Sequence, residues 1–245
     1  MVNQETTEKL IVMRLRGMAN AFREELQKPN TDLTFEERFG LLVDREWTLR
    51  QERSLQRRLK TAKLKQQQAC LEDIDYQASR GLDRSLVRTL ATCQWVRDHR
   101  NIILTGPTGI GKSYLACALA NKTCREGFTA FYIRVPRLLQ ELAIAHADGR
   151  YFKVLHKLGK VNLLVLDDWG FSRLKESERK DFLEVIEERS HQGSILIASQ
   201  LPLAKWHEHL GDPTIADAVL DRLIYNAYKL ELRGASMRQR RSTLT

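Results

Sequence analysis

A glycine-rich turn at residues 106–113 constrains the fold of this chain more than any other feature of its sequence. The turn fits the pattern GxxxxGK[ST], and its residues are Gly106, Pro107, Thr108, Gly109, Ile110, Gly111, Lys112 and Ser113. The apolar run NIILT precedes it, and the helical pattern SYLACALANKTCREG follows. This pattern is a phosphate-binding loop when a strand comes before it and a helix after it. The sequence therefore predicts an α/β fold with a nucleotide site at this turn.

Each part of the turn has a chemical role in binding a nucleoside triphosphate. Glycines allow the backbone to wrap a phosphate with its N–H groups, and the amino end of the following helix adds a positive dipole. We expect Lys112 to reach the β- and γ-phosphates and the Ser113 hydroxyl to ligate Mg²⁺.

A second apolar run, LLVL, ends in two adjacent carboxylates, Asp167 and Asp168. Such a pair at the end of a buried strand costs several kcal/mol unless a cation or solvent meets it. We expect Asp167 to hold magnesium and Asp168 to orient or polarise an attacking water. The alternative is a pair of surface aspartates that end a strand. With the glycine turn upstream, the pair favours hydrolysis over transfer to a small acceptor.

Three further polar residues are candidates for the same site. Ser199 and Gln200 follow the run SILIA, where a polar side chain meets the γ-phosphate or the water; the alternative is a strand that simply ends in polar residues. Arg222 lies on a predicted helix beyond that strand. It is either an arginine finger presented to the nucleotide of a neighbouring subunit or half of a surface ion pair with Asp221.

Helical and extended patterns alternate from residue 82 onward. Strands are predicted at NIILT, TAFYIR, VNLLVLDD, SILIAS and AYKLEL. Strands joined by helices form a parallel sheet that is covered on both faces. We therefore assign residues 82–245 to the α/β nucleotide-binding domain and residues 69–81, which are polar and mixed, to a linker.

Residues 1–68 contain no strand-like run and are predicted to form a small helical domain. One face of a first helix carries Ile11, Leu15, Met18, Phe22 and Leu26. Thr34 followed by Glu37 is the capping box of a second helix. Between Arg45 and Lys65 this helix carries eight Lys/Arg and two Glu, so it is either a basic binding face or a solvated surface.

The remaining composition limits the class of protein. The formal net charge is +9, which is consistent with a nucleic-acid partner but does not require one. No stretch approaches the roughly 20 apolar residues that span a bilayer, and the first residues show no secretory signal. The four cysteines form no CxxC pair. We expect a cytoplasmic protein with reduced thiols and no membrane contact.

Several of these motifs together resemble one family. They look like IstB, the ATP-binding partner of an insertion-sequence transposase and a relative of the helicase loader DnaC. The motifs that carry this resemblance are the glycine turn, LLVLDDWG, IASQLP, DRLIYNAYKLEL with RGASMRQRR, and the earlier LTFEERFGLLVDREW and IDYQASRGLDRSLV. The resemblance implies an AAA+ fold with a five-stranded parallel sheet, ATP as the nucleotide, and a bacterial protein on the nucleoid. It also implies ATP bound between subunits of a ring or filament on DNA.

The resemblance assigns roles and shows two departures. It implies Lys112 in Walker A, Asp167 and Asp168 in Walker B, Ser199–Gln200 as sensor 1, and Arg222 as the arginine finger. The usual catalytic Glu is Asp168 here, and the chain ends too soon after LEL for a helical lid, which leaves Arg238 as the sensor-2 candidate.

A helical insertion at 136–159 is implied to face duplex DNA. Its basic residues are Arg137, Arg150, Lys153 and Lys157, which suit backbone contacts with little sequence specificity, although solvated surface is the alternative for each. The function expected is a transposition helper ATPase. The alternatives are a helicase loader of the DnaC type, a P-loop nucleoside or nucleotide kinase, and a DNA-coating protein with a degenerate ATPase.

Overall fold

The computed structural model describes residues 2–28, 32–76 and 80–237 of the chain. The chain divides into two compact units, residues 1–57 and 58–245. This division falls before the predicted boundary at residue 68, because the residues that follow Arg57 pack on the second unit. Arg58 Nε donates to the carbonyl oxygen of Cys124 at 2.9 Å, and Ala62 and Leu64 are buried. The predicted ranges 1–68, 69–81 and 82–245 stay a prediction about domain organisation.

The first unit is helical. Its helices are α1 (Val2–Val12), α2 (Arg16–Gln27) and the start of α3 (Phe35–Ala62). The prediction of one continuous helix face from Ile11 to Leu26 was wrong, because the chain turns between α1 and α2 with Arg14 at a φ of 62°. The capping box is confirmed: Thr34 N donates to Glu37 Oε2 at 2.8 Å, and Glu37 N donates to Thr34 Oγ1 at 3.3 Å.

The second unit is built on a five-stranded parallel sheet, as predicted. Its strands are β1 (Asn101–Thr105), β2 (Ala130–Arg134), β3 (Leu163–Trp169), β4 (Ser194–Ser199) and β5 (Ala227–Glu231). They lie in the order β2-β3-β4-β1-β5, and every neighbouring pair is parallel. Parallel strands need crossover connections, which the helices between them supply. All carboxyl ends of the strands therefore meet at one edge of the sheet.

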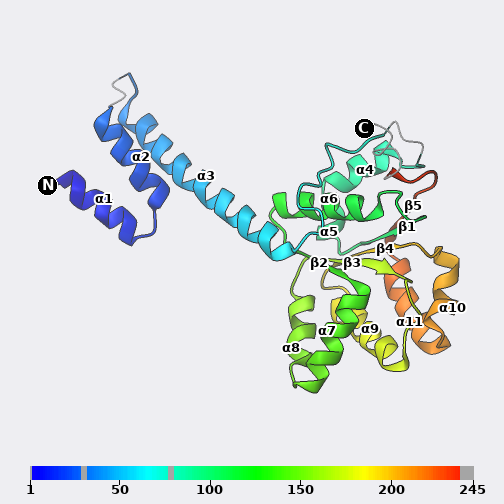
Figure 1. Cartoon of the computed structure of the whole chain (residues 1–245). Helices are drawn as coiled ribbons and strands as arrows, with labels where there is room; N and C mark the ends of the chain where they lie inside the picture. Colours follow the sequence, from blue (N-terminus) through cyan, green and yellow to red (C-terminus); the bar gives the residue numbers. More distant parts are fainter. Residues whose placement is uncertain (1, 29–31, 77–79, 238–245) are drawn as a thin grey trace. The chain divides into compact units, whose positions relative to one another are not determined.

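Helices cover both faces of this sheet (Figure 1). The helices of the second unit are α4 (Arg84–Ala91), α5 (Gln94–Arg97), α6 (Lys112–Arg125), α7 (Val135–Ala147), α8 (Tyr151–Gly159), α9 (Glu176–Arg189), α10 (Trp206–Leu210) and α11 (Pro213–Ile224). A short 3₁₀ turn, Leu203–Lys205, precedes α10. Helices α4 to α6 lie on one side of the sheet and α7 to α11 on the other. The predicted insertion at 136–159 is the pair α7 and α8.

Side chains alternate between the two faces of the strands. In β3, Leu164 and Leu166 belong to the large apolar cluster beneath α7 to α11, whereas Leu163 and Val165 are equally buried but lie outside it. A strand that is buried on both faces needs a continuous apolar run rather than an alternating one. This is why the runs NIILT and LLVL were readable as central strands.

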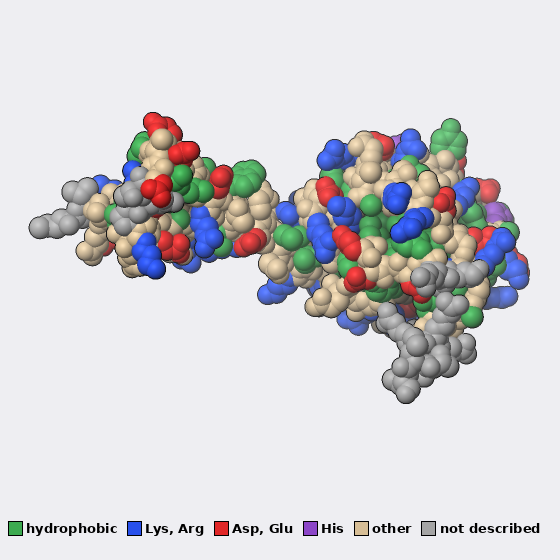
Figure 2. Space-filling model, turned by 90° about the horizontal axis from the view of Figure 1, so that it is seen from above, with side chains coloured by type: hydrophobic (Ala, Val, Ile, Leu, Met, Phe, Trp, Pro, Cys, Tyr) green, Lys and Arg blue, Asp and Glu red, His purple; other side chains and the backbone are tan. Residues whose placement is uncertain are grey.

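Charged side chains are mixed on the face that is covered by α4 and α6. Figure 2 shows Lys and Arg interspersed with Asp and Glu over this part of the second unit. The basic excess therefore does not gather into one patch on this face. Within residues 2–28, 32–76 and 80–237, no helix has the length and apolar character that a membrane crossing requires.

Candidate functional site

The glycine turn follows the carboxyl end of β1 and opens into α6. Gly106 and Gly111 have φ values of 145° and 102°, which side chains rarely tolerate. A Cβ on Gly106 would lie 2.3 Å from the carbonyl oxygen of Leu232. Gly111 is the N-cap of α6, and no side chain caps this helix end. Its first N–H groups therefore form the anion-binding end that a phosphate requires.

The Lys112 ammonium is folded back onto the turn. Its Nζ donates to the carbonyl oxygens of Gly106 and Pro107 at 2.7 and 2.9 Å. Burial lowers the pKa of Lys112, and the nearby carboxylates of Asp167 and Asp168 oppose this shift. The Lys112 ammonium is thus partly desolvated, and its hydrogen bonds go to neutral carbonyls. It fits a triphosphate, because the negative charge of the phosphates would compensate for the lost hydration.

Asp167 lies at the centre of a hydrogen-bonded group of oxygens. It is 1% exposed, and its Oδ2 accepts from Ser113 Oγ at 2.7 Å and from Tyr132 Oη at 2.5 Å. Burial and the bond to Asp167 raise the pKa of Tyr132, so the phenol stays a donor. A hydroxyl beside a carboxylate is the hard-oxygen pair that Mg²⁺ prefers. The residues predicted to ligate magnesium therefore lie together and fit the ion.

Asp168 occupies a strained position beside this group. Its φ is 59°, its N–H donates to Asp167 Oδ1 at 2.9 Å, and the register between β3 and β4 shifts between Leu166 and Trp169. Its Oδ2 accepts from Arg134 Nε at 2.5 Å, and this bond raises the pKa of Arg134. The sequence analysis missed Arg134, because only the pairing of β2 with β3 brings the two residues together.

Ser199 and Gln200 separate in the structure. The Ser199 hydroxyl is buried, donates to the carbonyl oxygen of Trp169 at 2.9 Å and accepts from Leu201 N at 2.9 Å. Gln200 lines the nucleotide pocket, and its Oε1 accepts from Thr108 Oγ1 at 2.7 Å. The geometry therefore favours Gln200 over Ser199 for a contact with phosphate or water.

Arg222 does not join this pocket. Its guanidinium donates to the carbonyl oxygen of Ala218 at 2.8 Å and pairs with Glu187 at 2.9 Å, and it lines a separate cleft beside His99 and His191. The alternative role for Arg222 was an ion pair with Asp221, and the structure has a pair with Glu187 in its place. Arg238, the sensor-2 candidate, lies outside the described residues.

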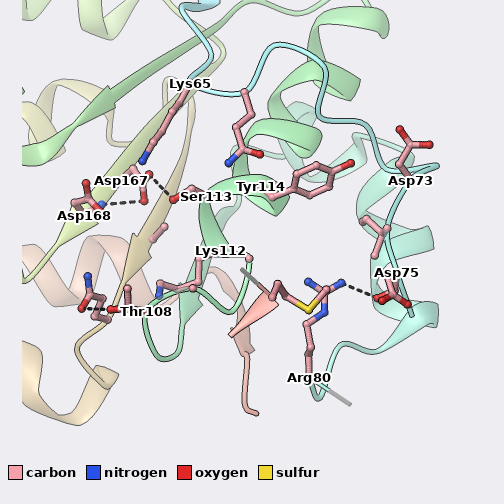
Figure 3. Close-up of a pocket in the computed structure, with 17 residues that line it drawn as sticks. Lys65, Asp73, Asp75, Arg80, Thr108, Lys112, Ser113, Tyr114, Asp167 and Asp168 are labelled. Carbon is pink, nitrogen blue, oxygen red and sulfur yellow. Dashed lines mark hydrogen bonds between the residues drawn. The ribbon is translucent and has the colours of Figure 1, made fainter. Parts of the chain in front are cut away.

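The pocket has a volume of about 200 Å³, and the linker forms one of its walls (Figure 3). Arg80 is buried and donates to the carbonyl oxygens of Ile110 and Asp75 at 3.3 and 2.7 Å. Other lining residues that the sequence analysis gave no role are Lys65, Gln66, Asp73, Ile74, Tyr114 and Met237. The segment IDYQASRGLDRSLV signalled family resemblance, but its composition indicated only a linker.

The four predicted DNA-binding residues lie on or beside α7 and α8. Arg137 Nε pairs with Glu141 at 3.0 Å, and Arg150 is bonded to Asp148. The Lys157 ammonium lies 6.0 Å from the ring centre of Phe131. All four side chains are exposed. The two ion pairs therefore contribute little to the free energy of folding. They remain available to an external partner.

Comparisons with known proteins identify the family of this chain. The model of the family described as IstB-like ATP-binding protein matches residues 8–245. An insertion-sequence ATP-binding protein, y4pL of Sinorhizobium fredii, is 48% identical over 240 residues, which cover 98% of each chain. The ATP-binding protein of insertion sequence IS1162 from Pseudomonas fluorescens is 48% identical over 203 residues, which cover 82% of this chain and 88% of the relative.

Solved structures share the fold at low sequence identity. The crystal structure of DnaI matches with a TM-score of 0.58 and 23% identity, over 68% of this chain and 92% of DnaI. The DnaC helicase loader matches with a TM-score of 0.53 and 20% identity, over 67% of this chain and 97% of the loader. The chain therefore belongs to the family of IstB-like ATP-binding proteins and is a P-loop ATPase with the AAA+ fold.

Proposed function

We propose that this ATPase binds ATP with Mg²⁺, assembles into a homo-oligomer on duplex DNA and assists the transposase of its insertion sequence. The relatives at 48% identity are insertion-sequence ATP-binding proteins, which supports a role in transposition. The rest of the proposal depends on the position of Arg222 relative to the phosphate-binding turn.

Arg222 and the turn lie at opposite ends of β1. At the amino end, Asn101 Nδ2 donates to the carbonyl oxygens of Arg222 and Leu223 at 3.0 and 3.2 Å. At the carboxyl end, Thr105 is followed by Gly106. A strand rises about 3.3 Å per residue, so the two ends are roughly 13 Å apart. Arg222 is therefore too far away to reach the nucleotide of its own chain, which supports a role at the nucleotide of another copy.

Within one chain, the proposed chemistry divides among five side chains. Lys112 leaves its two carbonyl partners and pairs with the β- and γ-phosphates. Ser113 and Asp167 would hold Mg²⁺, which would neutralise phosphate charge when bound. Asp168 orients the attacking water and accepts its proton at one carboxylate oxygen while Arg134 holds the other. Because Asp168 is shorter than the usual Glu, we expect slow turnover.

The DNA contact is proposed for α7 and α8. Their exposed basic residues, Arg137, Arg150, Lys153 and Lys157, suit phosphates rather than base edges. Bending a DNA site costs a few kcal/mol, which contacts repeated over several subunits can offset. A helicase loader of the DnaC type would use the same fold, but the insertion-sequence relatives favour transposition.

The experiment that tests the proposal is electron microscopy of the protein on duplex DNA with ATP, with ADP and without nucleotide. We expect ordered assemblies only with ATP. Lys112→Ala abolishes them, and Asp168→Asn makes them persist, because ATP stays bound. Arg88→Ala, a loss of one exposed arginine of α4 outside the pocket, is the matched control. Equal DNA binding by single subunits with and without ATP would refute the proposal.

A further inference from the structure

Residues 65–67, which lie between α3 and the linker, are held against α6, the helix that carries the phosphate-binding residues. The Cys117 thiol is buried on α6, and burial raises its pKa while the nearby backbone of Gln66 and Lys65 lowers it. One helical turn further on, Asn121 Nδ2 donates to the carbonyl oxygen of Gln67 at 3.4 Å. Residues three and four apart share one face of a helix, so these contacts form a continuous row. The backbone of Lys65 is therefore held in place relative to Lys112 at the start of the same helix.

The local chain path turns the Lys65 side chain into the nucleotide pocket. Helix α3 ends at Ala62, and Lys63 takes a left-handed conformation with a φ of 50°. Leu64 is 5% exposed and anchors the next residue. Lys65 lines the pocket, and Figure 3 shows its side chain pointing toward Asp167 and Asp168. In the part of the chain that the structure describes, no carboxylate lies within 4.0 Å of the Lys65 ammonium.

At this end of the pocket, three cationic side chains face two carboxylates, so one positive charge is left to bind an anion. Lys112 and Arg134 already face the two carboxylates of Asp167 and Asp168, and Arg134 is bonded to Asp168. Lys65 adds a third cation beside the same two carboxylates. This end also holds the Ser113–Asp167 pair, so it is where the terminal phosphate of a bound triphosphate would lie. The Lys65 ammonium is on a flexible stem, so it can move to contact that phosphate.

We propose that Lys65 binds the terminal phosphate of ATP and makes this site distinguish ATP from ADP. The inference rests on the proposed nucleotide site, and it adds a cation from the segment between α3 and the linker, which lies outside the glycine turn and the acidic pair. ADP lacks the phosphate that Lys65 would contact. Lys65 is thus a specificity-determining residue for the nucleotide, supplied by the segment that follows α3.

The test is equilibrium binding of a non-hydrolysable ATP analogue and of ADP, each with Mg²⁺, to the full chain. We expect Lys65→Met, which keeps the apolar stem, to weaken the ATP analogue about tenfold, because a charge-assisted hydrogen bond contributes at least that much. ADP affinity stays within about twofold of the unmodified chain, since its phosphates contact Lys112 instead. Lys65→Arg retains the preference for the ATP analogue, and Lys60→Ala changes neither affinity.

A second readout separates a phosphate contact from a structural role. The amides of residues 64–70 become more protected from hydrogen exchange with the ATP analogue than with ADP, and Lys65→Met removes this difference. Equal losses for both nucleotides, or no loss for either, would overturn the inference while leaving the nucleotide site intact. If the unmodified chain binds neither nucleotide, the proposed function and this inference both fail.

Discussion

Mixing two inactive variants tests whether Arg222 acts on the nucleotide of a neighbouring copy. Lys112→Ala removes the phosphate-binding cation, and Arg222→Ala removes the arginine at the other end of β1. Neither variant alone can form a complete site. In a mixture, the pocket of an Arg222→Ala subunit meets the intact Arg222 of a Lys112→Ala subunit. We expect the mixture to hydrolyse ATP although each variant alone does not.

The structure separates an effect between subunits from an effect within one chain. Across roughly 13 Å, one unit charge at an effective dielectric constant of about 20 contributes about 1.3 kcal/mol. Salt with a screening length of about 8 Å reduces this to roughly 0.3 kcal/mol, less than a twofold change in rate. An arginine in direct contact with the transferred phosphate accelerates hydrolysis by about 10³- to 10⁵-fold. A loss above about a hundredfold in Arg222→Ala therefore excludes action at a distance.

The assay is phosphate release at saturating ATP with duplex DNA, at a fixed total subunit concentration. In equal mixtures, half of the subunits keep an intact pocket and half of the neighbours keep an intact arginine, so at most about a quarter of the normal rate returns. Arg88→Ala, which removes an exposed arginine of α4, is the control and keeps full activity. A mixture no more active than its two components would refute the reasoning.

Three further substitutions test separate parts of the structure. Asp168→Asn, which leaves Arg134 without an anionic partner, lowers hydrolysis by about a hundredfold or more while ATP binding persists, measured by phosphate release and by equilibrium binding. Gly106→Ala places a Cβ 2.3 Å from the carbonyl oxygen of Leu232 at a φ of 145°; it lowers the free energy of unfolding by about 1–3 kcal/mol, measured by urea unfolding, and weakens nucleotide binding. Arg189→Met removes a buried guanidinium that donates to four backbone carbonyls. It costs about 3 kcal/mol or more, and Arg189→Lys does not restore stability because one ammonium cannot reach all four acceptors; an unchanged melting temperature would contradict this.

The parts of the fold that the sequence predicted are those encoded by local patterns. NIILT and LLVL are continuous apolar runs because β1 and β3 are covered on both faces, so period and length alone identified them. The glycine turn was readable because its backbone needs residues without a Cβ. The break at Arg14 was not readable, since the apolar spacing continues across it while the backbone changes direction.

The parts of the candidate site that the sequence did not reveal depend on contacts between distant segments. Arg134 meets Asp168 only through the register of β2 against β3. Arg80 is polar and lies in a stretch of mixed composition, yet it is buried against the turn because it satisfies the carbonyls of Ile110 and Asp75. Ser199 lies at the position that was expected to contact the γ-phosphate or the water. Its hydroxyl instead forms hydrogen bonds with backbone groups at the ends of β3 and β4.

The two halves of the proposed composite site share one rigid element. Asn101 ties the end of α11 to the start of β1, and its Oδ1 also accepts from Ile195 N at 2.9 Å, which adds β4. The strand between Asn101 and Gly106 is buried throughout, and buried parallel strands deform little because their packing is dense. We therefore expect a shift of the phosphate-binding turn to be transmitted along β1 toward Arg222. In a head-to-tail assembly, a change at one nucleotide would reach the next through the sheet rather than through a flexible loop, which makes β1 the shortest physical connection between successive sites.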